Sequence, residues 1–149
     1  LHLSLRRQRQ MCIRDRLIRG NHDNFLRTIA SKLNIPIADK YEMQDMIVLH
    51  GHKEMSTNKK IIMAHEHPSL ALRDKVGAIA KLPCYMVSKK IIVLPALSPL
   101  ATGTDVISDA SSYLSPILQK ANINEFEIYA ISHDELLHFS KIGALKEVI

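Results

Sequence analysis

Three short segments of the sequence place histidine directly after an apolar or strand-like run. They are residues 20–23 (GNHD), 49–52 (LHGH) and 64–67 (AHEH). Neutral imidazole nitrogen binds Mn, Fe, Ni and Zn, and the Asn21 side chain adds a hard oxygen. A single histidine is more often a surface or hydrogen-bonded residue, but three clusters in similar positions favour a shared site. The sequence therefore predicts a site for divalent cations.

The segments that precede two of these clusters have the pattern of buried strands. Residues 46–49 and 61–63 are short apolar runs, typical of strands that are covered on both faces. Each run ends in a loop, and such loops can converge while the strands fix where each loop starts. In a continued strand, His65 and His67 would lie on one face, because side chains alternate with a period of two. Both imidazoles could then reach one metal pair.

The rest of the chain reads as one domain rich in strands, without internal repeats. Residues 25–33 carry apolar side chains at helical spacing, so we expect a helix that ends at Asn34. Residues 84–87 and 91–94 are expected to form a hairpin, and residues 126–130 alternate in the manner of a strand. The sequence predicts a layered α/β domain.

The three histidine segments, in this order, resemble the motifs of the calcineurin-like metallophosphoesterases. The resemblance covers residues 17–145. Residues 65–74 (HEHPSLALRD) and 92–106 (IVLPALSPLATGTDV) are more narrowly similar to an archaeal branch related to the SbcD nuclease. The resemblance implies a layered β-sandwich flanked by helices, of which this chain would hold the C-terminal part. It also implies hydrolysis of phosphoester bonds, with nucleic acid as one candidate substrate.

The resemblance further implies which side chains bind metal. Asn21, His50 and His65 would bind the second of two divalent cations, and His67 would reach the first. His52 would lie behind these ligands. Manganese is the expected metal, and Fe, Zn and Ni suit the same donors.

Two further residues are implied to act on the substrate. His22 would stabilise or protonate the reacting phosphate, and Asp23 would orient His22. Two cations about 3.5–4 Å apart clamp the phosphate and activate a bridging water for in-line attack. Ala64 stands where the family often has glycine, which is a mild departure.

Two family motifs are missing from the chain. Neither an Asp-x-His near the N-terminus nor a Gly-Asp-x-x-Asp (or Asn) before the GNHD segment occurs here. Residues 11–16 (MCIRDR) reverse-translate into text that resembles a sequencing-library adapter, so residues 1–16 are expected to be adapter-derived. Residues 17–149 would then be the C-terminal portion of a single metallophosphoesterase domain. Without the bridging aspartate we expect the first metal site to be lost, the second to be weak and the chain as given to be inactive.

The formal net charge of +5 comes mainly from the N-terminal residues. Residues 1–16 hold five arginines and one aspartate, whereas residues 17–149 hold 15 basic and 14 acidic side chains. A nearly neutral domain lacks the basic patch typical of nucleic-acid binding, so charge gives no support for DNA as substrate. No apolar run approaches the roughly 18 residues of a membrane span, and two cysteines make no disulfide framework. A cytoplasmic location without membrane contact is expected.

Two other functions fit the same residues. The chain could be a non-catalytic pseudoenzyme, in which a degenerate phosphoesterase fold serves partner interaction. It could also be a mononuclear metal-binding module that uses Asn21, His50, His65 and His67 alone. The stoichiometry of bound metal separates this last function from a two-metal hydrolase.

Overall fold

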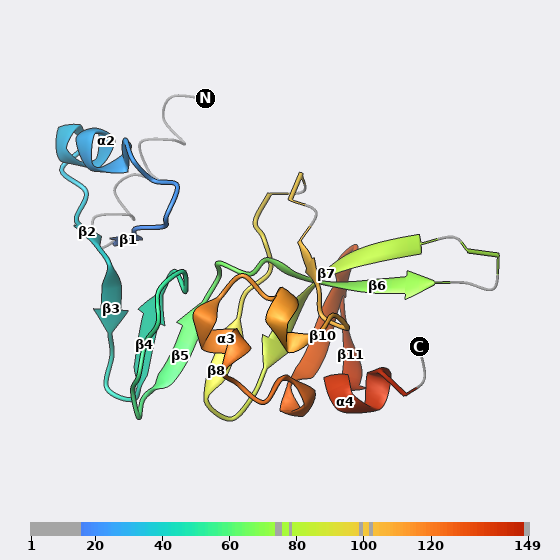
Figure 1. Cartoon of the computed structure of the whole chain (residues 1–149). Helices are drawn as coiled ribbons and strands as arrows, with labels where there is room; N and C mark the ends of the chain where they lie inside the picture. The colour runs from blue at the N-terminus through green and yellow to red at the C-terminus, as the bar shows by residue number, and fades with distance from the viewer. Residues whose placement is uncertain (1–15, 74–75, 78, 99, 102, 148–149) are drawn as a thin grey trace.

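The largest feature of the structure is a mixed sheet of nine strands (Figure 1). This computed structural model describes residues 16–147 except residues 74, 75, 78, 99 and 102. Seven strands follow in the order β11-β10-β7-β8-β5-β4-β3; β6 joins through β7, and β9 through β6. The strands are β3 (Lys40–Glu42), β4 (Met46–Leu49), β5 (Lys60–Met63), β6 (Pro68–Arg73), β7 (Ile79–Val87), β8 (Ile91–Val93), β9 (Thr104–Asp105), β10 (Glu127–Ser132) and β11 (Glu135–Lys141). The sheet-rich α/β class expected from the sequence is confirmed.

The centre of the sheet consists of three parallel strands, β4, β5 and β8. Ile47 pairs with Ile61, and Ile61 pairs with Ile91. Ile47, Leu49, Ile61 and Met63 are buried on one face, whereas Val48 and Ile62 on the other face are only partly buried, so the expected cover on both faces is incomplete. Since β4 and β5 run in the same direction, their last residues, Leu49 and Met63, lie at the same edge. The loops that carry the predicted histidines start at that edge.

The antiparallel half of the sheet is also close to the prediction. β7 and β8 form the expected hairpin, with Met86 opposite Val93. In the segment that leads into β10 and along it, Phe126, Ile128 and Ala130 are buried, as the alternating pattern requires. β7 is long enough to pair with β6 through its first residues and with β10 through its last.

Short helices cover one face of this sheet (Figure 1). They are η2 (Ala110–Ser112), α3 (Pro116–Gln119), η3 (Ile123–Glu125) and α4 (Ile142–Leu145). Pro116 opens α3, where its missing N–H costs nothing. Leu118 and Ile142 are fully buried and join the core that the sheet residues Met63 and Met86 form.

The N-terminal described residues form a separate small unit, which Figure 1 places at the end of the main sheet beside β3. It consists of β1 (Leu17–Ile18), α2 (Leu26–Lys32) and β2 (Ile37–Ala38), with β1 and β2 parallel. The predicted helix is confirmed, but its apolar stripe is not covered. Phe25, Ile29 and Leu33 are 80%, 54% and 45% exposed, and Ala30 is the one buried residue of α2.

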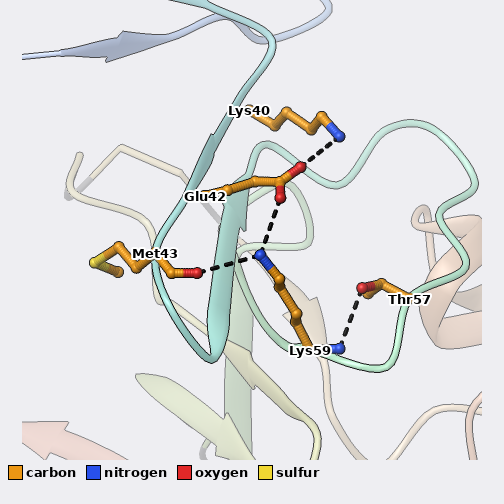
Figure 2. A network of polar contacts seen from close by, with 5 residues as sticks. All are labelled: Lys40, Glu42, Met43, Thr57 and Lys59. Atoms are coloured by element: carbon orange, nitrogen blue, oxygen red, sulfur yellow. Dashed lines mark hydrogen bonds and ion pairs between the residues drawn. The ribbon is translucent and has the colours of Figure 1, made fainter.

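The edge strand β3 is tied to the rest of the sheet by charged side chains. Figure 2 shows the Glu42 carboxylate between the ammonium groups of Lys40, at 2.7 Å, and Lys59, at 3.0 Å. Lys59 Nζ also donates to the Met43 carbonyl, and the Lys59 N–H donates to Thr57 Oγ1. Hydrogen bonds from the two lysines lower the pKa of Glu42 to about 2. Because these groups are exposed, the network orders the strand edge more than it stabilises the fold.

Two remaining expectations concern the N-terminal residues and membrane contact. Of the residues predicted to be adapter-derived, 1–15 lie outside the described part of the chain. No helix in the described part is both long and apolar enough to cross a bilayer.

A buried leucine of α3 and an exposed leucine elsewhere should differ in how much they contribute to stability. Leu118 is 0% exposed, whereas Leu97 is 101% exposed. We expect Leu118→Ala to lower the free energy of unfolding by about 2–5 kcal/mol, because it leaves a cavity in the core. Leu97→Ala, the matched control, should change it by less than about 0.5 kcal/mol. Urea unfolding followed by circular dichroism measures both, and equal effects would contradict this packing of the core.

Candidate functional site

Two loops dock on each other beyond the carboxyl ends of β4 and β5. The His50 carbonyl, directly after β4, accepts the backbone N–H groups of Ala64 at 3.2 Å and His65 at 2.8 Å. The turn after β5 is therefore fixed against the loop after β4. The loop after β1, residues 20–23, reaches the same place through its side chains.

The side chains of Asn21, His50 and His65 converge on one point. Asn21 Oδ1 lies 3.0 Å from His50 Nε2, and His65 Nδ1 lies 3.0 Å from the same nitrogen. The centroids of the two rings are 4.8 Å apart. Three segments that are far apart in the sequence thus contribute one donor atom each to a compact set.

Asn21 Oδ1, His50 Nε2 and His65 Nδ1 can each offer a lone pair, and one ring proton cannot form a good hydrogen bond with all of them. If His50 carries its proton on Nε2, that N–H is shared between Asn21 Oδ1 and His65 Nδ1. If His65 carries a proton on Nδ1, the His50 lone pair faces the amide oxygen. A divalent cation accepts all three lone pairs, and two ligands bound at about 2.1 Å on perpendicular axes are about 3.0 Å apart. The donor types and their spacing therefore fit a bound cation.

A glycine allows the GNHD loop to pack against the His50 ring. A Cβ added to Gly20 would lie 3.0 Å from His50 Cε1 and 3.1 Å from Asp23 Oδ2, tighter than most real Cβ contacts, so these neighbours would have to shift. The Gly20 N–H donates to Asp23 Oδ2 at 2.7 Å. Asp23 thus holds the turn of the loop that presents Asn21.

The environment keeps the His50 ring neutral near pH 7. Burial, together with the nearby charges of His65 and His52, lowers the pKa of His50 to about 4. The charge of Asp23 acts in the opposite direction and is outweighed. A neutral imidazole is the form that binds metal.

The pKa of His65 is lowered as well, and charges of several neighbouring residues contribute to it. Burial lowers the pKa of His65; the charge of Glu66 opposes this, and the charges of His52, His67 and His22 lower the pKa further. All five histidines of the three predicted clusters therefore lie within electrostatic range of one another or of this ring. Their contacts differ, however.

The expectation that His65 and His67 share one strand face is wrong. β5 ends at Met63, and residues 64–67 form a turn in which His67 takes a φ of 51°. The His67 N–H donates to the Ala64 carbonyl at 3.4 Å, and its ring is exposed. His65 reaches His50 and Asn21, whereas His67 lies outside that set, so its role as a ligand stays a prediction.

His22 and His52 differ in how exposed they are to solvent. His22 is exposed in the turn after β1. The His52 ring lies 5.2 Å from the His50 ring, and its buried Nδ1 atom has no hydrogen-bond partner among the described residues. The roles predicted for His22 as phosphate donor and for Asp23 as its partner are not decided by these contacts.

One residue of this site has no signal in the sequence pattern. Glu66, between the two histidines of the turn, is 1% exposed, and its carboxylate accepts the N–H groups of Leu114 at 3.0 Å and Ser115 at 2.9 Å. A buried acid flanked by polar residues breaks the rule that acids are exposed, so periodicity alone could not find it. Its partners are 48 and 49 positions later in the chain.

A cavity of about 440 Å³ opens beside His67. Pro68 and Leu97 give it apolar surface, and Lys81 adds a charged side chain. The cavity borders the histidine turn and is large enough for part of a small organic molecule.

The candidate set of metal ligands is small. Within the described residues, no group of three or more His, Cys, Asp and Glu side chains is arranged to hold a metal ion. The compact set consists of two histidines, His50 and His65, and the amide of Asn21. The predicted pair of metals therefore has a described donor set for one cation at most.

Comparisons with known proteins support the fold. No family model and no curated protein matches the chain at a significant level. Among solved structures, the chain is similar to the nuclease MPE of Pseudomonas putida, with a TM-score of 0.58 and 20% sequence identity. The similarity covers 83% of this chain and 53% of the nuclease, so the chain spans about half of that protein. The likeness shows a phosphoesterase-like fold and gives no support for an archaeal branch.

The lowered pKa of His50 predicts how stability depends on pH when metal is removed by a chelator. Between pH values of about 6.5 and 4, the unfolded chain binds a proton at His50 that the folded chain does not, so acid favours unfolding. We expect the free energy of unfolding to fall by about 1 kcal/mol from about pH 7 to about pH 5, after allowance for solvent screening of this half-buried ring. Urea unfolding at the two pH values measures it.

Two variants check that the histidine is the cause. His50→Gln should reduce this pH dependence, whereas His133→Asn, at an exposed position with a φ of 54° that asparagine tolerates, should leave it unchanged. His65, whose pKa is also lowered, should keep part of the slope in His50→Gln. A stability that is the same at both pH values, or a slope that His50→Gln leaves unreduced, would show that burial of the His50 ring does not control the pH dependence.

Proposed function

We propose that this chain carries part of the active site of a metal-dependent phosphoester hydrolase. The observation that carries the proposal is the convergence of Asn21 Oδ1, His50 Nε2 and His65 Nδ1 at 3.0 Å spacing. They meet at the carboxyl edge of two parallel strands, where α/β folds commonly bind ligands. The similarity in fold to a nuclease supports the same reaction class.

Each described residue would have a defined task. Asn21, His50 and His65 would hold one divalent cation, with manganese as the expected metal and Fe, Zn or Ni as alternatives. His67 would serve a second cation from the adjoining turn. When bound, a pair of such cations lowers the pKa of a water molecule and offsets the charge of the phosphate.

The GNHD loop would contact the substrate. His22 is exposed beside the donor set, so its ring can donate a hydrogen bond or a proton to a phosphate oxygen or the leaving group. Asp23 accepts the Gly20 N–H at 2.7 Å and thereby keeps this loop turned toward His50. The cavity beside His67 would receive the organic part of the phosphoester, next to Lys81.

Charge is the reason why this chain would not suffice for catalysis. Two imidazoles and one amide are neutral ligands, and two dications held close together need carboxylates between them. No described residue supplies such a bridging carboxylate in the donor set. We infer that the complete site draws carboxylates from additional polypeptide, and that residues 17–149 correspond to the C-terminal portion of the domain. The chain as given should bind one cation and lack activity.

A mononuclear metal-binding module is the second candidate. One observation favours it: among the described residues a single compact donor set is present, and His67 lies outside it. A non-catalytic module of the same fold would follow if the intact protein also lacked the carboxylates.

Metal titration of the chain tests the donor set. With Co²⁺ as the probe, absorption spectroscopy and calorimetry should give one bound cation per chain. His65→Ala should weaken binding by at least about 100-fold, because loss of a direct ligand exceeds the 10–100-fold typical of supporting residues. His133→Asn should bind as the wild type does. Absence of binding, or binding that His65→Ala leaves intact, would rule out this site.

Activity is tested on the complete domain with Mn²⁺ and bis(p-nitrophenyl) phosphate. We expect hydrolysis that requires the cation, and His22→Ala should lower kcat by about 10²–10⁴-fold while metal stoichiometry is unchanged. A complete domain that binds one cation and hydrolyses nothing would favour the mononuclear module. A His22→Ala variant with full activity would remove His22 from the mechanism.

A further inference from the structure

The two histidine loops are linked a second time, on the side away from their backbone contact. Glu66 lies between His65 and His67 and is 1% exposed. Both of its carboxylate oxygens are occupied: Oε1 accepts the Leu114 N–H at 3.0 Å and Oε2 accepts the Ser115 N–H at 2.9 Å. Hydrogen bonds from two adjacent backbone amides to one carboxylate are strong and directional. The turn after β5 is therefore anchored to the segment before α3.

The same segment holds the other loop. Ser115 is 0% exposed, and its Oγ donates to the Gly51 carbonyl at 2.7 Å. Gly51 is the residue that follows His50 and has a φ of 104°; an added Cβ would lie 3.2 Å from the side chain of Met63. This loop thus has little room to shift without breaking the hydrogen bond.

We propose that Glu66 and Ser115 act together as a positioning pair, which sets the separation of His50 Nε2 and His65 Nδ1. The Ala64 and His65 N–H groups both donate to the His50 carbonyl, at 3.2 Å and 2.8 Å, so these two bonds attach the loops at a single oxygen atom. One attachment leaves the turn free to pivot about it. The path from Glu66 through Ser115 to Gly51 is a second attachment, and two attachments fix the orientation of both rings.

This inference rests on the proposed metal site for its functional meaning. Ligands of a metal need supporting hydrogen bonds that hold their donor atoms in place. Glu66 touches none of the three donor atoms, so it would hold the turn in position, but its charge also acts on His65. Ser115→Ala removes no charge and therefore isolates the effect of position.

A neighbouring hydrogen bond provides a matched control. Gln119 Nε2 donates to the Tyr113 carbonyl at 2.7 Å, within the same segment, and contacts neither histidine loop. Loss of this bond perturbs the segment without breaking the link between the loops. Gln119→Ala therefore separates a general loss of order in the segment from a loss of positioning.

The experiment compares Co²⁺ binding by the full chain and four variants: Glu66→Gln, Ser115→Ala, the double variant and Gln119→Ala. Glu66→Gln should weaken binding by about 10–100-fold, since its amide N–H₂ meets a backbone N–H donor instead of accepting from it. Ser115→Ala should also weaken binding and serves as the milder test if Glu66→Gln does not fold. The double variant should bind Co²⁺ about as weakly as the single variant with the lower affinity, because loss of either hydrogen bond already disconnects the two loops. Gln119→Ala should bind within about twofold of the wild type.

Several outcomes would overturn the pairing of these residues. They are wild-type affinity in Glu66→Gln and Ser115→Ala, affinity decreases that multiply in the double variant, and a decrease in Gln119→Ala as large as in the others. The ¹⁵N shifts of the His50 and His65 rings are a second readout that needs no metal. If the wild-type chain binds no Co²⁺, the proposed metal site fails, and these shifts decide the inference by themselves. Wild-type ring shifts in Ser115→Ala, which removes no charge, overturn it, whereas shifts that change in Ser115→Ala and stay at wild-type values in Gln119→Ala support it.

Discussion

The parallel pairing of β4 with β5 is the constraint on which the candidate site depends. The register that places Ile47 opposite Ile61 and Val48 opposite Ile62 brings both strands to an end at one edge of the sheet. A slip of one residue would turn the buried side chains of either strand away from the core, so burial of the core face holds the register. The histidines that follow these strands are then close together, and the hydrogen bonds to the His50 carbonyl fix them there.

Electrostatics gives this edge its chemical character. The donor set of Asn21, His50 and His65 is uncharged near pH 7, because burial lowers the pKa of both histidines. Neutral lone pairs held 3.0 Å apart repel one another slightly and attract a cation strongly. Negative charge lies nearby but is used within the protein: Asp23 accepts the Gly20 N–H, and Glu66 accepts two backbone N–H groups. The described residues thus offer candidate ligands for one cation and, among themselves, no carboxylate placed to bridge two.

Much of the fold could be predicted from the sequence because its strongest signals are local. The apolar runs at β4 and β5, the hairpin of β7 and β8, and the alternation along β10 each correspond to burial in the structure. The sequence could also predict that Asn21, His50 and His65 come close together, although not at what distances, since loops at the ends of neighbouring strands meet. Periodicity also found the helix α2, but it could not show that Phe25 and Ile29 remain exposed. Burial of a helix face depends on a partner, which a helical pattern does not contain.

The remaining differences have a common physical cause in long-range contacts. The turn after β5 forms because Glu66 binds a segment 48 positions later, and this burial of Glu66 takes His65 and His67 out of strand alternation. No local pattern encodes that contact. The predicted roles of His67 as a metal ligand and of His22 at the phosphate likewise depend on groups beyond their own loops.

The hydrolase and the mononuclear metal-binding module both require that Asn21, His50 and His65 hold one divalent cation. Anomalous diffraction at the cobalt edge, from crystals of the chain grown with Co²⁺, observes such a cation without reference to activity. We expect one anomalous peak, within about 2.1 Å of His50 Nε2, His65 Nδ1 and Asn21 Oδ1. A map without a peak there, or with its peak at other residues, would contradict the assignment of these ligands.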